Sequence, residues 1–200
     1  LYMQVRSRAL DDALLAFVRG GGRQVVILGA GFDARALRLR DALRGAVVYE
    51  VDHPATQGRK RAMPGVDGAG ARMIAWDFER DAMRGLPARL AAEGHDAAAP
   101  TFTLWEGVTM YLSAEAVAET LDAVRAYSAA GSGLAFNYVA GGARRGVGRV
   151  GMALARAVVA AAGEPFRSTF DPAALSALLS AHGFVVSRDD SFATLAAALL

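Results

Sequence analysis

Acidic residues follow each of the first four short apolar runs of the chain. They are Asp33, Glu50, Asp52, Asp77 and Glu106. Each run is typical of a strand, and the carboxyl ends of parallel strands meet at one edge of a sheet. Carboxylates at such an edge can accept hydrogen bonds from ribose hydroxyls or from an adenine amino group. The pattern predicts a nucleoside-binding crevice. Because strand residues two apart share a side, we expect both Glu50 and Asp52 at its rim.

A glycine turn, Gly29-Ala30-Gly31, precedes Asp33 and leaves two cofactors open. Ala34 completes a G-x-G-x-x-A pattern, which is typical of NAD-type oxidoreductases. In those proteins the helix N-terminus faces a pyrophosphate, which Asp33 in the first turn would repel. S-adenosylmethionine brings an ammonium and a sulfonium in place of phosphates, so the acid favours that cofactor. A tight strand-to-helix turn without any ligand is a third interpretation.

Strands and helices alternate along the chain, and this arrangement must position the acids. We predict strands at residues 24–28, 47–51, 72–76, 101–105, 134–138, 184–187 and 192–200. Helices are predicted at residues 5–18, 33–43, 57–62, 80–93, 114–129 and 172–182. The alternation indicates an α/β fold with a doubly wound, mostly parallel sheet flanked by helices. No linker divides the chain, so we expect a single domain over residues 1–200.

The composition excludes several kinds of site and partner. The 200 residues include no cysteine, which rules out disulfides, thiolate metal sites and thiol nucleophiles. The net charge is only +2 and the arginines are scattered, so we expect no nucleic-acid partner. The chain has no apolar run of the ~18 residues that a membrane span needs, and no visible signal peptide. We therefore expect a cytoplasmic protein with no membrane partner, and the few dispersed histidines predict no metal site.

Five strings of the chain carry a resemblance to a known family. They are LGAGFDAR at 28–35, EVDHPATQGRK at 50–60, DF at 77–78, PTFTLWEGVTMYL at 100–112 and GEPFRSTFDPAALSALLSAHGF at 163–184. Together they resemble the leucine carboxyl methyltransferase-like branch of class I S-adenosylmethionine-dependent methyltransferases, and most of all its actinobacterial O-methyltransferases. The resemblance covers nearly all of residues 5–195. It implies a Rossmann-like sheet of seven strands, the cofactor S-adenosyl-L-methionine with S-adenosyl-L-homocysteine as product, and methylation of an oxygen of a small molecule or carboxylate.

The resemblance also implies roles for single residues at the cofactor. Arg6 matches an arginine that binds the methionine carboxylate, a charge-assisted contact. Gly29 and Gly31 lie in the turn where the backbone passes the cofactor. Asp52 matches the acid that holds the ribose, and Glu106 matches an acid near the methionine portion.

Three further acids and an aromatic complete the predicted cofactor site. Asp77 and Phe78 match the pair beside the adenine. Glu50 is left as a supporting partner of the ribose acid. Asp33 stands where a carboxylate suits a positively charged cofactor.

The methyl acceptor is much less defined. A carboxylate acceptor is already ionised, whereas a hydroxyl acceptor needs a base. Tyr111 is the candidate polar group near the acceptor, but it could equally anchor its turn. Arg144, Arg145 and Arg149, in the glycine-rich stretch 141–151, could attract an anionic substrate or lie on a solvated loop.

Three departures from the family are visible. Family members usually have a longer N-terminal segment that folds over the cofactor, and here the chain starts almost at Arg6, so we expect that lid to be missing. Ala34 stands where threonine is commoner. The chain also ends with the strand predicted at residues 192–200. A non-catalytic domain that binds the cofactor is therefore an alternative to an enzyme.

Overall fold

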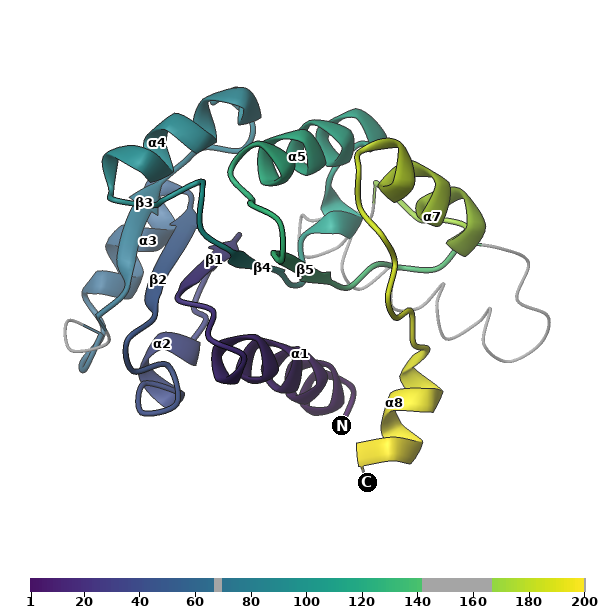
Figure 1. The fold of residues 1–200 in the computed structure, drawn as a ribbon, viewed down its shortest axis with the longest axis horizontal. Coiled ribbons are helices and arrows are strands. Elements are labelled where there is room, and N and C mark those ends of the chain that lie inside the picture. The colour runs from purple at the N-terminus through teal and green to yellow at the C-terminus, as the bar shows by residue number, and fades with distance from the viewer. Residues whose placement is uncertain (67–69, 142–166, 200) are drawn as a thin grey trace.

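The structure, a computed structural model, describes residues 1–66, 70–141 and 167–199. Its centre is a parallel sheet of five strands in the order β3-β2-β1-β4-β5 (Figure 1). The strands are β1 (Gln24–Leu28), β2 (Val47–Asp52), β3 (Arg72–Ala75), β4 (Thr101–Trp105) and β5 (Gly133–Phe136). The order reverses next to β1, where the chain passes from β3 across to β4. Ligands bind at such a switch point in open α/β sheets.

Helices cover both faces of the sheet, which confirms the doubly wound α/β prediction. The helices are α1 (Tyr2–Arg19), α2 (Arg35–Arg38), α3 (Pro54–Arg61), α4 (Leu86–Ala92), α5 (Ala114–Ala126), α7 (Pro172–Ala181) and α8 (Phe192–Leu199). Two short 3-10 turns are η1 (Met83–Gly85) and η2 (Thr109–Tyr111). In Figure 1, α1 lies below the sheet, and α4, α5 and α7 lie above it.

Two hydrophobic cores lie on the two faces of the sheet, because side chains alternate along each strand. On one face, Val26 and Leu28 pack with residues of α4, α5 and α7. On the other face, Val25 and Ile27 pack with Leu14 and other residues of α1. All five residues of β1 are buried, as is typical of a parallel strand covered on both sides.

The predicted starts of two helices are confirmed by their capping contacts. Ser113 Oγ accepts the N–H of Ala116 at the start of α5. Asp171 Oδ1 accepts the N–H groups of Ala173 and Ala174 at the start of α7, and Pro172 is its first residue.

Three predicted elements are wrong. The helix expected at 33–43 is only α2, and Leu39 to Gly45 form turns in which hydrogen bonds such as Arg40 N–H to Leu37 O span three residues. The strand expected at 184–187 is irregular, and Val185 is 92% exposed, because no neighbouring strand pairs with it among the described residues. The strand expected at 192–200 is helix α8.

Helix α8 forms because its alanine-rich sequence favours a helix and because Ser191 caps it. Ser191 Oγ accepts the N–H of Thr194. The helix packs along α1, where the rings of Phe192 and Tyr2 lie 5.1 Å apart. The sheet of the described residues therefore has five strands and not seven.

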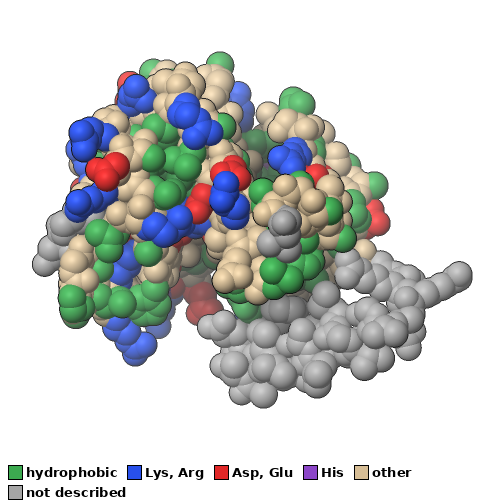
Figure 2. All heavy atoms as spheres, turned by 90° about the horizontal axis from the view of Figure 1, so that it is seen from below, with side chains coloured by type: hydrophobic (Ala, Val, Ile, Leu, Met, Phe, Trp, Pro, Cys, Tyr) green, Lys and Arg blue, Asp and Glu red, His purple; other side chains and the backbone are tan. Residues whose placement is uncertain are grey.

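Seen from the side of α1, basic side chains, which are arginines, are spread over the surface with acidic side chains among them (Figure 2). No helix in the described part of the chain is long and apolar enough to cross a membrane. Most of the glycine-rich stretch 141–151, with Arg144, Arg145 and Arg149, lies outside the described residues.

Candidate active site

The glycine turn joins β1 to α2 and holds its shape through backbone angles that favour glycine. Gly29 has φ +63° and Gly31 has φ +49°. A Cβ atom on Gly29 would lie 2.4 Å from Cγ2 of Val108, so the turn packs closely against the segment after β4. Asp33 Oδ1 accepts the N–H of Arg35 at 2.7 Å and so begins α2. The sequence predicted this turn, and its glycines have a steric reason.

Asp52, at the end of β2, ties the glycine turn to the neighbouring strand. Its Oδ2 accepts the N–H of Gly31 at 2.6 Å, and its Oδ1 accepts the N–H of His53 at 2.6 Å. The side chain is half-buried at the carboxyl edge of the sheet. Each carboxylate oxygen has a second lone pair, so Asp52 can still accept hydrogen bonds from a ligand.

Glu50 lies beneath the rim rather than on it, so the expectation that it shares the rim with Asp52 is wrong. Its side chain is buried, and Oε2 accepts a hydrogen bond from Lys60 Nζ at 2.6 Å. Lys60 also donates to the backbone carbonyl of Asp33 at 2.6 Å. Burial raises the pKa of Glu50, and Lys60 offsets this only in part. Glu50 therefore supports the glycine turn indirectly, through Lys60 and its hydrogen bond to the backbone of Asp33.

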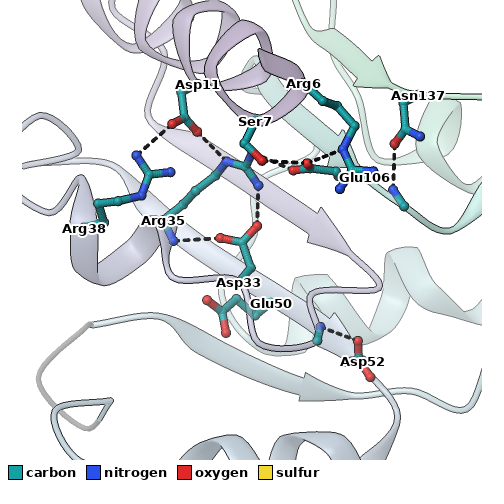
Figure 3. Close-up of polar contacts among 12 residues, drawn as sticks. Arg6, Ser7, Asp11, Asp33, Arg35, Arg38, Glu50, Asp52, Glu106 and Asn137 are labelled. Atoms are coloured by element: carbon teal, nitrogen blue, oxygen red, sulfur yellow. Dashed lines mark hydrogen bonds and ion pairs between the residues drawn. The ribbon is translucent and has the colours of Figure 1, made fainter. Parts of the chain in front are cut away.

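A set of alternating charges, which we call the charge cluster, lies between α1, the glycine turn and the end of β4 (Figure 3). Its members are Arg6, Asp11, Asp33, Arg35, Arg38 and Glu106. Arg35 is its centre: Nε donates to Asp11 Oδ1 at 2.7 Å, and NH1 donates to Asp33. Burial alone would lower the pKa of Arg35, but Asp33 and Glu106 outweigh burial and raise it.

Glu106 is held from two sides within the charge cluster. Its Oε1 accepts hydrogen bonds from Arg6 Nε at 2.7 Å and Ser7 Oγ at 2.9 Å. Its Oε2 lies 2.6 Å from NH2 of Arg35. Burial would raise the pKa of Glu106, but Arg35 and Arg6 outweigh it and hold the pKa below its usual value. Glu106 is thus an anion that orients Arg6.

Asp77 and Phe78 follow β3, beside the end of β2. Oδ2 of Asp77 lies 3.5 Å from Nε2 of His53, and its Oδ1 accepts the N–H of Glu79. Phe78 is half-buried against the core on the α5 face. The structure thus places Asp52 at the end of β2 and Asp77 just after the end of the adjacent strand β3, and His53 contacts both.

Tyr111 lies in η2, which follows Glu106 by a few residues. It is half-buried, and its N–H donates to Val108 O at 2.9 Å. The same loop is fixed to β5 by Asn137, whose Oδ1 accepts the N–H of Gly107 at 2.7 Å (Figure 3). These contacts therefore fix the loop after β4 against the end of β5.

Several residues of the site were not predicted from the sequence. Arg35 and Lys60 lie inside the family-like strings LGAGFDAR and EVDHPATQGRK, and the second is the only lysine of the chain. These two positions offered a signal. Asp11, Ser7 and Asn137 had none, because only the tertiary fold brings them to the turn and to Glu106.

Comparison with known proteins identifies sequence relatives over most of the chain. A sequence model of the leucine carboxyl methyltransferase family matches residues 1–125. A protein of Mycobacterium sp. (strain KMS), named as a predicted S-adenosyl-L-methionine-dependent methyltransferase, is 44% identical over 145 residues. That match covers 70% of this chain and 45% of the relative, so the chain spans less than half of the relative's length.

Solved structures share the fold at low sequence identity. An O-methyltransferase family protein from Burkholderia thailandensis has a TM-score of 0.64 at 13% identity, covering 92% of this chain and 53% of that one. Human N-acetylserotonin methyltransferase in complex with SAM has a TM-score of 0.57 at 15% identity, covering 86% of this chain and 45% of that one. The parallel sheet flanked by helices is therefore the fold of these methyltransferase structures.

Proposed function

The chain belongs to the leucine carboxyl methyltransferase family, and on that premise we propose that it binds S-adenosyl-L-methionine and transfers its methyl group. The acceptor we propose is an oxygen atom of a small molecule or of a carboxylate. Its relatives' names and the fold of the O-methyltransferase structures support this proposal. We treat residues 1–200 as a single cofactor-binding domain. The seven-stranded sheet that the family resemblance implies remains a prediction, of which β1 to β5 are five strands.

One observation carries the proposal: the side chains of Arg6 and Asp52 are both held in place by contacts within the chain, near the carboxyl edge of the sheet. Arg6 donates its Nε–H to Glu106, and its guanidinium lies 5.7 Å from the centre of the Tyr2 ring. Among the described residues, no hydrogen bond is formed by its NH1 and NH2 groups. Those groups suit the carboxylate of a methionine moiety. Asp52, across the turn, suits the hydroxyls of a ribose. The methionine carboxylate and the ribose of the proposed cofactor thus each have a side chain of complementary chemistry, Arg6 and Asp52.

The other candidate residues divide into contacts and supports. Asp77 and Phe78 are proposed to contact the adenine, and the backbone of Gly29 and Gly31 to pass beside the cofactor. Asp33, Glu50 and Glu106 are proposed to support those contacts, because each is paired with a cation of the chain itself.

When bound, S-adenosyl-L-methionine supplies a methyl group on a positively charged sulfur. The protein's part in such a displacement is alignment. Arg6 and Asp52 would fix the two ends of the cofactor, and η2 with Tyr111 would border the acceptor. A carboxylate acceptor needs no base. Tyr111 is the proposed polar contact if the acceptor is a hydroxyl.

Calorimetric titration with S-adenosyl-L-homocysteine, with NAD as control, tests the proposal. Micromolar binding of the first ligand alone supports it. Binding of NAD alone would replace it with an oxidoreductase, and binding of neither would contradict a cofactor site. Methyl transfer from labelled cofactor to a panel of carboxylates and phenols then separates an enzyme from a domain that binds without turnover.

A further inference from the structure

We propose that Arg35 is a positioning residue, which fixes Glu106 and through it Arg6 for recognition of the amino-acid end of the cofactor. This inference rests on the proposed function of the same site. Arg35 itself lies on the far side of Glu106 from Arg6 and has no role assigned by the family resemblance. Its side chain is 4% exposed, so it acts through its neighbours.

Arg35 joins three elements that are far apart in sequence. Its Nε reaches Asp11 in α1, its NH1 reaches Asp33 in the glycine turn, and its NH2 reaches Glu106 after β4 (Figure 3). These contacts pull α1 onto the turn. Since α1 also carries Arg6 and Ser7, the same contacts place both donors that hold Glu106 Oε1.

The chain of contacts sets the direction of the Arg6 guanidinium. Arg35 is paired with Oε2 of Glu106, and Arg6 meets Oε1 alone. A single oxygen can accept the Nε–H of Arg6 but cannot form the paired, two-oxygen contact that arginine and carboxylate usually prefer. Arg6 therefore keeps NH1 and NH2 for a second carboxylate, that of the ligand.

Loss of Arg35 would direct the NH1 and NH2 groups of Arg6 away from the ligand and toward Glu106. The charge cluster holds three arginines against three carboxylates, and removing Arg35 leaves Asp33 and Glu106 without their shared cation. The guanidinium of Arg6 can then rotate so that its NH1 and NH2 groups also donate to Glu106 and neutralise the charge of that carboxylate. The ligand carboxylate would lose its partner, although Arg6 is still present.

Lysine cannot replace Arg35 in this geometry. The three carboxylates approach from three elements: Nε and NH1 of the planar guanidinium donate to Asp11 and Asp33, and NH2 forms an ion pair with Glu106. An ammonium is a single point charge on a flexible stem. Arg35→Lys keeps the charge but cannot hold Asp11, Asp33 and Glu106 in their present directions.

The test compares two ligands that differ only at the amino-acid end. S-adenosyl-L-homocysteine carries the amino and carboxylate groups, and 5′-deoxy-5′-methylthioadenosine lacks them. We expect Arg35→Lys and Arg35→Gln to weaken the first ligand by about ten-fold or more and the second by less than about two-fold. Arg89→Gln is the control: Arg89 is a half-exposed arginine of α4 that is paired with Glu93 and lies outside the charge cluster, and both affinities should stay within about two-fold.

Equal losses for both ligands would show that Arg35 is merely structural, and unchanged affinities would show that it is dispensable; either result overturns the inference. If the Arg35 variants do not fold, the double variant Arg35→Lys with Asp33→Asn is used, because it leaves one carboxylate fewer without a partner. The loss of affinity for S-adenosyl-L-homocysteine relative to that for methylthioadenosine is then the deciding measurement. Failure of the proposed function is distinguishable, because the unmodified protein would then bind neither ligand.

Discussion

Asp52 offers a test in which stability and binding can be measured apart. Asp52→Ala removes the acceptor of two backbone N–H groups, those of Gly31 and His53, each at 2.6 Å. The site is half-buried, so water can partly replace the carboxylate. We expect the free energy of unfolding to fall by about 1–3 kcal/mol, which is about 2–12 °C in Tm for a chain of this length.

The effect on the ligand adds to the effect on the fold. A carboxylate that accepts ribose hydroxyls contributes about 1–3 kcal/mol, so the Kd of S-adenosyl-L-homocysteine should rise about 5- to 150-fold. Calorimetric titration of the folded variant, below its Tm, measures this change directly. The loss should appear equally with methylthioadenosine, because both ligands carry the ribose.

The control is Asp171→Ala, which removes another aspartate that accepts two backbone N–H groups. Asp171 caps α7, so its loss should cost about 0.5–2 kcal/mol of stability. Its affinity for the ligand should not change. A folded Asp52→Ala protein that binds S-adenosyl-L-homocysteine within about two-fold of the unmodified chain would refute the ribose assignment, whatever its Tm.

Three further substitutions test other parts of the site and core. Arg6→Ala should weaken S-adenosyl-L-homocysteine by about ten-fold and leave adenosine nearly unchanged in calorimetric titrations; equal losses would remove Arg6 from the carboxylate. Gly29→Ala should destabilise the chain by about 2–4 kcal/mol in denaturant unfolding, because φ is positive and the new Cβ meets Val108; adding Val108→Ala should restore only the packing part. Burial lowers the pKa of His95, so the folded state resists its protonation while the unfolded state takes a proton below about pH 6.5. Stability should therefore decline as pH falls through that range, and His95→Phe should make the decline shallower in urea titrations at pH 5 to 7.

Local signals in the sequence determined most of the fold. The strands at 101–105 and 24–28 are bounded by residues that end strands, and the caps at Ser113 and Asp171 begin helices where expected. The errors lie where a pattern needed a tertiary partner. Val185 and its neighbours have strand propensity but no strand beside them, and α8 became a helix along α1.

In the candidate site, too, local features were predictable from the sequence and tertiary partners were not. The glycine turn and Asp52 are local features of β1 and β2, and the structure has them where the sequence predicted them. The cations that neutralise the other acids were not predictable from spacing. Lys60 reaches Glu50 across ten residues, and Glu106 meets Arg6 across one hundred.

We therefore expect an acid at the carboxyl edge of this sheet to contact the ligand only where the chain supplies no buried cation for it. Asp33, Glu50 and Glu106 are each paired with a mostly buried arginine or lysine. Asp52 is bonded only to backbone N–H groups, and it keeps its capacity for a neutral donor such as a hydroxyl.

The balance of the charge cluster has a consequence for selectivity. Its three arginines and three carboxylates cancel, so the cluster presents no net positive field that would attract anions in general. Recognition of one carboxylate must then come from the direction of two N–H groups of Arg6. Direction is set by burial and by competing hydrogen bonds, which is why a residue without ligand contact, Arg35, can decide which ligand the site prefers.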